Sequence, residues 1–244
     1  LYAQVEDAAR IKTDFLNMAA HELRTPLTVV RGYLSMLGDG NFGPVPESWE
    51  QPLKILVAKT EELGRLVDDL LLAARLETGR VTLSPQPADL NRLASAAVDR
   101  ARPQARAQAA DLRFEGARRP LVVEADPEQL GRILDALIAN ALAFSAGRSW
   151  VRVRVRPAAG GLARVEVEDR GRGIPEEHAA RIFERFYRVD DERWPAQPGT
   201  GLGLYIARAL ALRQGALLAL ERTAPGQGSL FVLAIPEVGP APDD

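Results

Sequence analysis

Residues 151–174 read VRVRVRPAAGGLARVEVEDRGRGI, and this stretch decides the fold class of the second part of the chain. Valine and arginine alternate from Val151 to Val155, which is the period-two pattern of a strand with one buried face. Residues 165–167 continue the alternation in a second strand, and residues 230–235 predict a third. The arginines follow from this alternation, so we interpret them as a solvated strand face and not as a nucleic-acid patch.

Helical segments flank these strands along the sequence. Residues 89–106, 127–145 and 202–214 each predict a helix. Asp126 is placed as the N-cap of the second of these, and Pro127 suits its first turn. We therefore expect an α/β two-layer sandwich, in which one layer of helices covers one mixed sheet.

The first part of the chain has a helical pattern instead. Apolar residues recur with 4-3-4-3 spacing from Leu23 to Leu37, and a second such seam runs from Leu56 to Ala74. Gly79 is placed to end the second helix. This all-α hairpin cannot bury its apolar stripes alone, so we expect a homodimer that closes a four-helix bundle.

Four segments follow from these patterns. We expect a dimerisation hairpin, a linker, an α/β domain and a tail, which occupy residues 1–79, 80–87, 88–238 and 239–244.

Composition narrows the function classes. The 31 Lys and Arg nearly balance the 33 Asp and Glu, so the overall charge does not indicate a protein that binds nucleic acid. The chain has no cysteine, which excludes disulfides, thiolate metal sites and a cysteine nucleophile. No apolar run approaches the ~18 to 20 residues that span a bilayer, so we expect a cytoplasmic segment without membrane contact. Because the chain begins at Leu1 and not at Met, we expect any sensor or membrane anchor to lie upstream.

A histidine in the first predicted helix carries candidate chemistry. His21 lies in AHELRTPL, outside the apolar seam, where its neutral imidazole is a competent nucleophile near pH 7. Glu22 can accept a hydrogen bond from the other ring nitrogen and raise the basicity of the attacking one. A surface His-Glu pair is by itself usually neutral, with no function. Pro26 favours a functional role for the pair, because it removes a helix hydrogen bond one turn later and so suggests that the helix must bend.

Two glycine-rich segments and one asparagine point to a nucleotide. Asp169 follows a strand and precedes Gly171 and Gly173, so its carboxylate can accept a hydrogen bond from an exocyclic amine such as that of adenine. Residues 199–204, GTGLGL, lead into a helix whose N-terminal amides favour phosphate. Neither segment is a P-loop. Asn140 offers an amide oxygen suited to Mg²⁺, although a lone mid-helix asparagine is by default a satisfied polar group.

Five segments in this order resemble the histidine kinases of bacterial two-component systems. FLNMAAHELRTPL looks like their phosphoacceptor box, ILDALIANAL like their asparagine box, and RIFERFYRVD like their phenylalanine box. DRGRGI and GTGLGL look like their two glycine boxes. The resemblance spans nearly the whole chain. It implies ATP-dependent autophosphorylation with Mg²⁺, followed by phosphoryl transfer to an aspartate on the receiver domain of a response regulator, and in some members phosphatase activity toward that regulator.

The resemblance also implies a role for individual residues. His21 would be the phosphoacceptor, Glu22 its acid-base partner, and Thr25 the residue that orients water for dephosphorylation. Arg188 would approach the γ-phosphate, and Asn140 would bind Mg²⁺. The remaining nucleotide-binding positions would be Asp169, Gly171, Gly173, Gly199, Thr200, Gly201, Leu202 and Gly203. A lid over residues 189–200 would be anchored by Phe183 and Phe186.

The chain departs from the family pattern near the asparagine box. Ala136 replaces a frequent Asn, Ala143 replaces a Lys or Arg that often reaches the phosphates, and Phe144 replaces a frequent Tyr. Two rival classes remain open. One is a module that binds ATP without transferring phosphate, and the other is an ATPase of the same nucleotide fold, as in type II topoisomerases, mismatch-repair proteins or heat-shock chaperones. The HELRTP helix argues against the second rival.

Overall fold

The computed structural model describes residues 2–145, 149–189 and 199–238, and the side chains of residues 2–17 and 21 lie outside that description. The chain divides into two compact units, Leu1–Val81 and Thr82–Asp244. No helix in the described ranges is both long enough and apolar enough to cross a bilayer.

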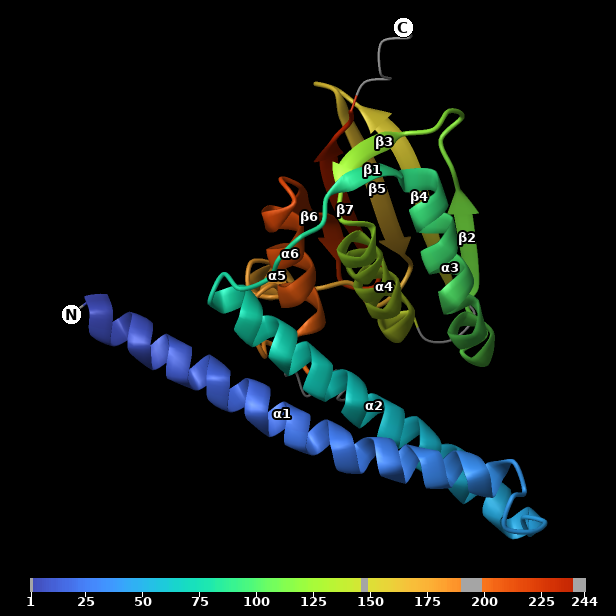
Figure 1. Ribbon diagram of the computed structural model, residues 1–244. Helices are drawn as coiled ribbons and strands as arrows, with labels where there is room; N and C mark the ends of the chain where they lie inside the picture. Colours follow the sequence, from blue (N-terminus) through green and yellow to red (C-terminus); the bar gives the residue numbers. More distant parts are fainter. Residues whose placement is uncertain (1, 146–148, 190–198, 239–244) are drawn as a thin grey trace, which may run out of the picture. The chain divides into compact units, whose positions relative to one another are not determined.

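The first unit is a hairpin of two long helices, as the apolar seams predict. Helix α1 (Tyr2–Gly38) runs through Pro26 without interruption, and α2 (Glu47–Glu77) follows after a short loop (Figure 1). Gly79 ends α2 in the left-handed region at φ 72°, and the Arg80 amide donates to the Arg75 carbonyl at 3.0 Å. The predicted stop signal is therefore confirmed.

The hairpin buries only part of its apolar surface. Ala20, Val67 and Leu71 form a small buried cluster between the helices. Other seam side chains remain between 37% and 56% exposed: Leu23, Val30, Leu37, Leu56 and Leu63. One hairpin alone therefore leaves an apolar stripe uncovered.

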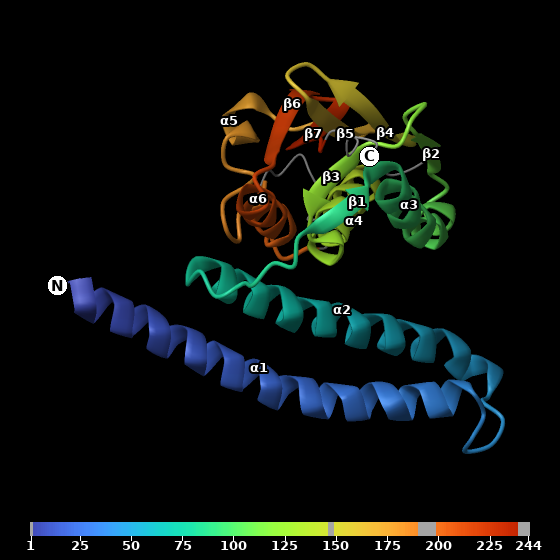
Figure 2. The ribbon, with the colours of Figure 1, turned by 45° about the horizontal axis from the view of Figure 1, so that its top comes forward.

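The second unit is a two-layer α/β sandwich. Its sheet has the order β2-β4-β5-β7-β6, in which β2 and β4 are parallel and all other neighbours are antiparallel. Figures 1 and 2 show α3, α4 and α6 covering one face of this sheet. The strands are β2 (Asp111–Glu115), β4 (Trp150–Ala158), β5 (Leu162–Asp169), β6 (Leu217–Ala224) and β7 (Gly228–Pro236), and the helices are α3 (Leu90–Ala107), α4 (Pro127–Phe144), α5 (Glu176–Ala179) and α6 (Gly203–Arg213). A separate antiparallel pair joins β1 (Gln86–Asp89) to β3 (Val122–Ala125).

The core lies between the helix layer and the sheet. Val153 and Val167 face each other across β4 and β5, and both are fully buried. The Asp126 carboxylate caps α4, since it accepts from the amides of Glu128 at 3.0 Å and Gln129 at 3.1 Å. The mixed sheet, the three helices and this cap match the sequence predictions, whereas β1, β2, β3, β6 and α5 had not been predicted.

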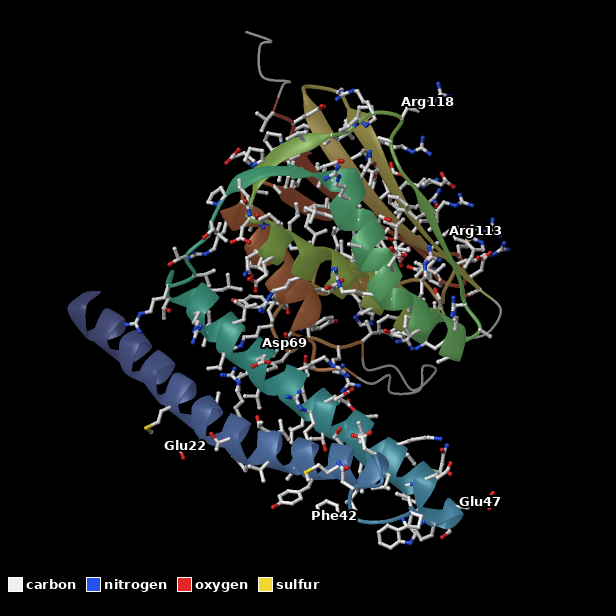
Figure 3. All side chains as sticks on the ribbon, turned by 45° about the vertical axis from the view of Figure 1, so that its right-hand side comes forward. Glu22, Phe42, Glu47, Asp69, Arg113 and Arg118 are labelled. Carbon is white, nitrogen blue, oxygen red and sulfur yellow. The ribbon has the colours of Figure 1, made fainter. Side chains whose placement is uncertain are left out.

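The opposite face of the sheet carries the alternating arginines in a lattice of ion pairs. Arg154 bonds Glu166 at 2.8 Å and Glu168 at 2.9 Å, and its side chain is only 17% exposed. Figure 3 shows Arg113 at the β2 border of the unit. The arginines do leave the helix-covered face, as predicted, but the glutamates of β5 partly cover them, so they are less solvated than the alternation suggested.

Candidate functional site

Asp169 is the last residue of β5, and the residue is 4% exposed. Oδ1 accepts a hydrogen bond of 2.8 Å from the Gly171 amide, and the Ser229 amide donates to the same carboxylate. Burial nevertheless raises the pKa of Asp169 to about 6, because desolvation outweighs both hydrogen bonds. Burying a carboxylate at the end of a strand costs desolvation free energy, and such a group suits ligand recognition better than core packing.

Three glycines let the backbone close tightly around this carboxylate. A Cβ on Gly171 would lie 2.2 Å from the Phe144 carbonyl oxygen and 2.8 Å from Asp169 Oδ1. Gly173 has φ +72° and Gly228 has φ +85°, and a Cβ on either would strike backbone at 1.9 Å. Larger residues would therefore displace the turn that holds Asp169.

Thr223 fixes the far side of the same turn. Its Oγ1 accepts from the Ile174 amide at 2.8 Å and lies 3.1 Å from Ser229 Oγ. Sequence reasoning missed this residue, because β6 was not predicted and a lone threonine carries no local signal.

Asn140 lies in the fourth turn from the α4 N-terminus and is half-buried. Its side-chain amide has no hydrogen-bond partner among the residues that the structure describes, and because the residue is only half-buried, solvent can reach it. Phe144 follows four residues later on the same helix face, and its carbonyl accepts from the Arg172 amide at 3.3 Å. The end of α4 thus meets the glycine turn that follows Asp169.

The second glycine segment forms the start of α6. Gly201 has φ +72°, and a Cβ there would lie 2.7 Å from the Phe186 backbone. The Thr200 hydroxyl accepts from the Leu202 amide at 3.2 Å, and no side chain caps the helix itself. The space around the Cβ position of Gly203 is open, since a Cβ there would meet no atom of the described residues within 4 Å. Uncapped amides at this helix start can receive an anion.

The phenylalanine segment packs between α5 and α6 unevenly. Phe183 is half-buried, with an edge-on contact to Phe231 at 6.3 Å between ring centroids. Phe186 is 53% exposed and has φ 60°, while its amide donates to the Gly201 carbonyl at 3.1 Å. Phe183 is therefore packed against the sheet, whereas Phe186 is held mainly through its backbone. Arg188 is exposed, and residues 190–198 of the predicted lid lie outside the described residues.

One half-buried histidine lies beside this segment. His178 Nδ1 lies 2.6 Å from the Tyr187 hydroxyl, and the Arg181 guanidinium stands over the Tyr187 ring at 4.2 Å.

The phosphoacceptor candidates lie in the other unit, on α1. The His21 backbone is helical, and its side chain lies outside the described residues. Glu22 and Thr25 are exposed, and Figure 3 shows Glu22 directed away from α2. Thr25 follows His21 by four residues and so shares its helix face.

Comparison with known families assigns both units. Residues 11–79 match the His Kinase A (phospho-acceptor) domain, and residues 125–239 match the histidine kinase-, DNA gyrase B-, and HSP90-like ATPase. The chain belongs to the sensor histidine kinases: it joins a phosphoacceptor hairpin to an ATP-binding domain of that class.

Individual relatives cover almost the whole chain. It is 36% identical over 237 residues to the circadian input-output histidine kinase CikA of Synechococcus elongatus. That match covers 96% of this chain and 31% of CikA. It is 36% identical to the histidine-protein kinase/phosphatase MprB of Mycolicibacterium smegmatis, over 91% of this chain and 43% of MprB. Full-length ShkA, crystallised with AMPPNP, superposes with a TM-score of 0.77 at 28% identity, over 93% of this chain and 46% of ShkA. The chain thus spans less than half the length of each of these relatives.

Proposed function

We propose that this chain transfers the γ-phosphoryl group of ATP to His21 and passes it to an aspartate on a response regulator. The observation that carries the proposal is the buried Asp169 carboxylate, held by the Gly171 amide at 2.8 Å beside the end of the Asn140 helix. This arrangement suits an adenine amine at one end and phosphates at the other. Family membership and the AMPPNP complex of ShkA support the choice of nucleotide.

Asn140 is proposed to hold Mg²⁺ through its amide oxygen. No group of three or more His, Cys, Asp or Glu residues in the described ranges could hold a metal ion by itself. A single amide oxygen with no described protein partner fits Mg²⁺, which keeps most of its ligands as water and substrate phosphate. When bound, the ion neutralises charge on the phosphates.

The chain's own residues are proposed to divide the remaining tasks. A ring nitrogen of His21 attacks the γ-phosphorus, the bond to the β–γ bridging oxygen breaks, and ADP leaves with that electron pair. Glu22 accepts the hydrogen bond of the other ring nitrogen, and Arg188 faces the γ-phosphate. The uncapped amides at the start of α6 receive the phosphates.

Phosphatase activity toward the regulator is a second proposed function. It rests on Thr25, which shares a helix face with His21, and on MprB, a relative named as a kinase/phosphatase.

We further propose that the hairpin dimerises. Exposed seam residues such as Leu63, at 50% exposure, would be covered by the hairpin of a second copy.

Incubation with γ-labelled ATP and Mg²⁺ tests the phosphoacceptor assignment directly. The adduct should be acid-labile and base-stable, as a phosphoramidate is. The chain has only two histidines, so His178→Gln is the matched control for His21→Gln. Label should vanish in His21→Gln and persist in His178→Gln, and label that survives His21→Gln would refute the assignment.

A further inference from the structure

Arg172 stands over the last aromatic ring of α4. Its guanidinium carbon lies 4.3 Å from the centroid of the Phe144 ring. The Arg172 backbone is fixed on both sides, because its amide donates to the Phe144 carbonyl at 3.3 Å and its own carbonyl accepts from the Gly226 amide at 2.6 Å. The Arg172 side chain is half-buried, and this burial lowers its pKa.

This pair borders the Asp169 carboxylate. Gly171, the residue between Asp169 and Arg172 in the turn, leaves no room for a Cβ between the Phe144 carbonyl and Asp169 Oδ1. The carboxylate, the glycine backbone and the end of α4 are therefore in mutual contact. Arg172 follows Gly171 directly in the chain, and its guanidinium lies over the ring of Phe144, the residue whose carbonyl oxygen meets Gly171. The uncapped amides of α6 belong to a different element, and Asn140 lies one helical turn before Phe144.

A planar cation placed next to a carboxylate suits a heteroaromatic base. Guanidinium groups stack on aromatic planes, and an arginine already held over one ring loses little further freedom when a second plane packs on it. Aromatic and arginine planes are common stacking surfaces for bases.

We propose that Arg172, held over Phe144, is a base-stacking residue of the nucleotide site and packs on the base whose amine Asp169 binds. The inference rests on the proposed nucleotide function of this site and adds to it a residue that binds the base. It predicts that the plane of the side chain matters more than its charge.

Calorimetry with adenosine and with inorganic tripolyphosphate separates the two ends of the site. Arg172→Lys keeps the positive charge but loses the planar guanidinium. It should therefore weaken adenosine binding about 3- to 30-fold and leave the affinity for tripolyphosphate unchanged. Phe144→Leu should weaken adenosine in the same direction, and the double variant should lose no more than the larger single loss, because the two side chains act as one unit. Thermal unfolding of the ligand-free variants confirms that each one folds.

Other outcomes would overturn the inference. Unchanged adenosine affinity in Arg172→Lys would show that the plane is not used. A loss confined to tripolyphosphate would place the guanidinium at the phosphate end, and equal losses for both probes would indicate a merely loosened turn. Asp169→Asn is the reference variant. If it loses adenosine binding while Arg172→Lys does not, only the role of Arg172 is wrong, whereas unchanged binding in Asp169→Asn would contradict the proposed site itself.

Discussion

The backbone amide of Ser84 donates a hydrogen bond of 2.9 Å to Oδ2 of Asp126, 42 residues further along the chain. The other carboxylate oxygen of Asp126 caps α4, so one buried side chain joins the linker to the helix that carries Asn140. Gln214 completes the arrangement, because its Oε1 accepts from the Asp126 amide at 2.8 Å. Ser84, which lies in the predicted linker of residues 80–87, is thereby fastened to the ATP-binding unit.

Asp126→Ala should therefore have a local and a remote effect. Loss of the cap is expected to lower the free energy of unfolding by about 1 to 2 kcal/mol, and the Ser84 amide should exchange its hydrogen much faster. Asp89→Ala is the matched control, because Asp89 caps α3 through the Asn91 amide at 2.9 Å. It should cost a similar free energy without altering exchange at Ser84, as measured by denaturation and amide exchange. Slow exchange at Ser84 in Asp126→Ala would contradict the proposed tether.

Asp169 should make adenosine binding depend on pH. Its folded-state pKa is raised to about 6, so the carboxyl is ionised at pH 7 and mostly protonated at pH 5. Only the ionised form accepts the adenine hydrogen bond fully, so affinity should fall about tenfold as pH drops across this interval. Adenosine is the probe because it lacks the titrating phosphates of ATP.

Asp169→Asn is the control for that profile. At neutral pH it should bind ATP more weakly by about 1.5 to 3 kcal/mol, since a charge-assisted hydrogen bond is lost, and its adenosine profile should be flat. The variant should still fold, since it keeps the size of the side chain. A pH profile unchanged by the substitution would show that another group titrates.

Gly201→Ala should destabilise the ATP-binding unit. The residue has φ +72°, and a Cβ would meet the Phe186 backbone at 2.7 Å, so a loss of about 1 to 3 kcal/mol is expected in denaturant unfolding. Gly203→Ala lies two residues away in open space at the helix start and should be neutral or slightly stabilising. Equal destabilisation by both variants would refute the backbone argument.

Light scattering tests the proposed dimer. Leu63→Lys places a charge on the uncovered apolar stripe and should shift the chain toward monomer at micromolar concentration. Leu212→Lys, at a 60% exposed position of α6, is the matched control and should leave the mass unchanged. A monomeric mass for the unsubstituted chain would rule the dimer out.

Glu22 and Thr25 should separate two reactions on one turn of helix. Glu22→Ala is expected to slow autophosphorylation by about 10²- to 10⁴-fold, the usual range for general acid-base help. Thr25→Ala should leave that step largely intact and impair dephosphorylation of a regulator. Single-turnover kinetics measure the first effect and loss of label from a phosphorylated receiver domain the second. Equal slowing by both substitutions, with no change in dephosphorylation, would show that the division of roles is wrong.

Local signals made much of this fold predictable. The start of α4 followed from Asp126 and Pro127, and the end of α2 followed from Gly79, because helix caps and stop signals lie within a few residues of the helix ends. Alternation placed β5 and therefore Asp169 at its end. In contrast, β1 and β3 have four residues each and are defined by their pairing across more than thirty residues of chain, so neither has a pattern of its own.

The site was predictable only where a residue type and its neighbours carry the chemistry. Asp169 with its glycines and Asn140 on its helix are of this kind. No separate role for Arg172 could be predicted from the sequence, because its contact with the Phe144 ring depends on the tertiary fold. The second bond of Asp126 depends on a tertiary contact with Ser84, which the sequence around either residue does not indicate.

β2 is an edge strand of the five-stranded sheet. Among the described strands β2 pairs with β4 alone, so its other edge offers backbone groups that are not paired with another described strand. Its side chains Asp111, Arg113 and Glu115 are charged and exposed, and an added strand would have to accommodate all three beside it. These charges should keep the sheet from extending into filaments, so replacing them with threonine or valine should promote aggregation while the nucleotide site stays intact.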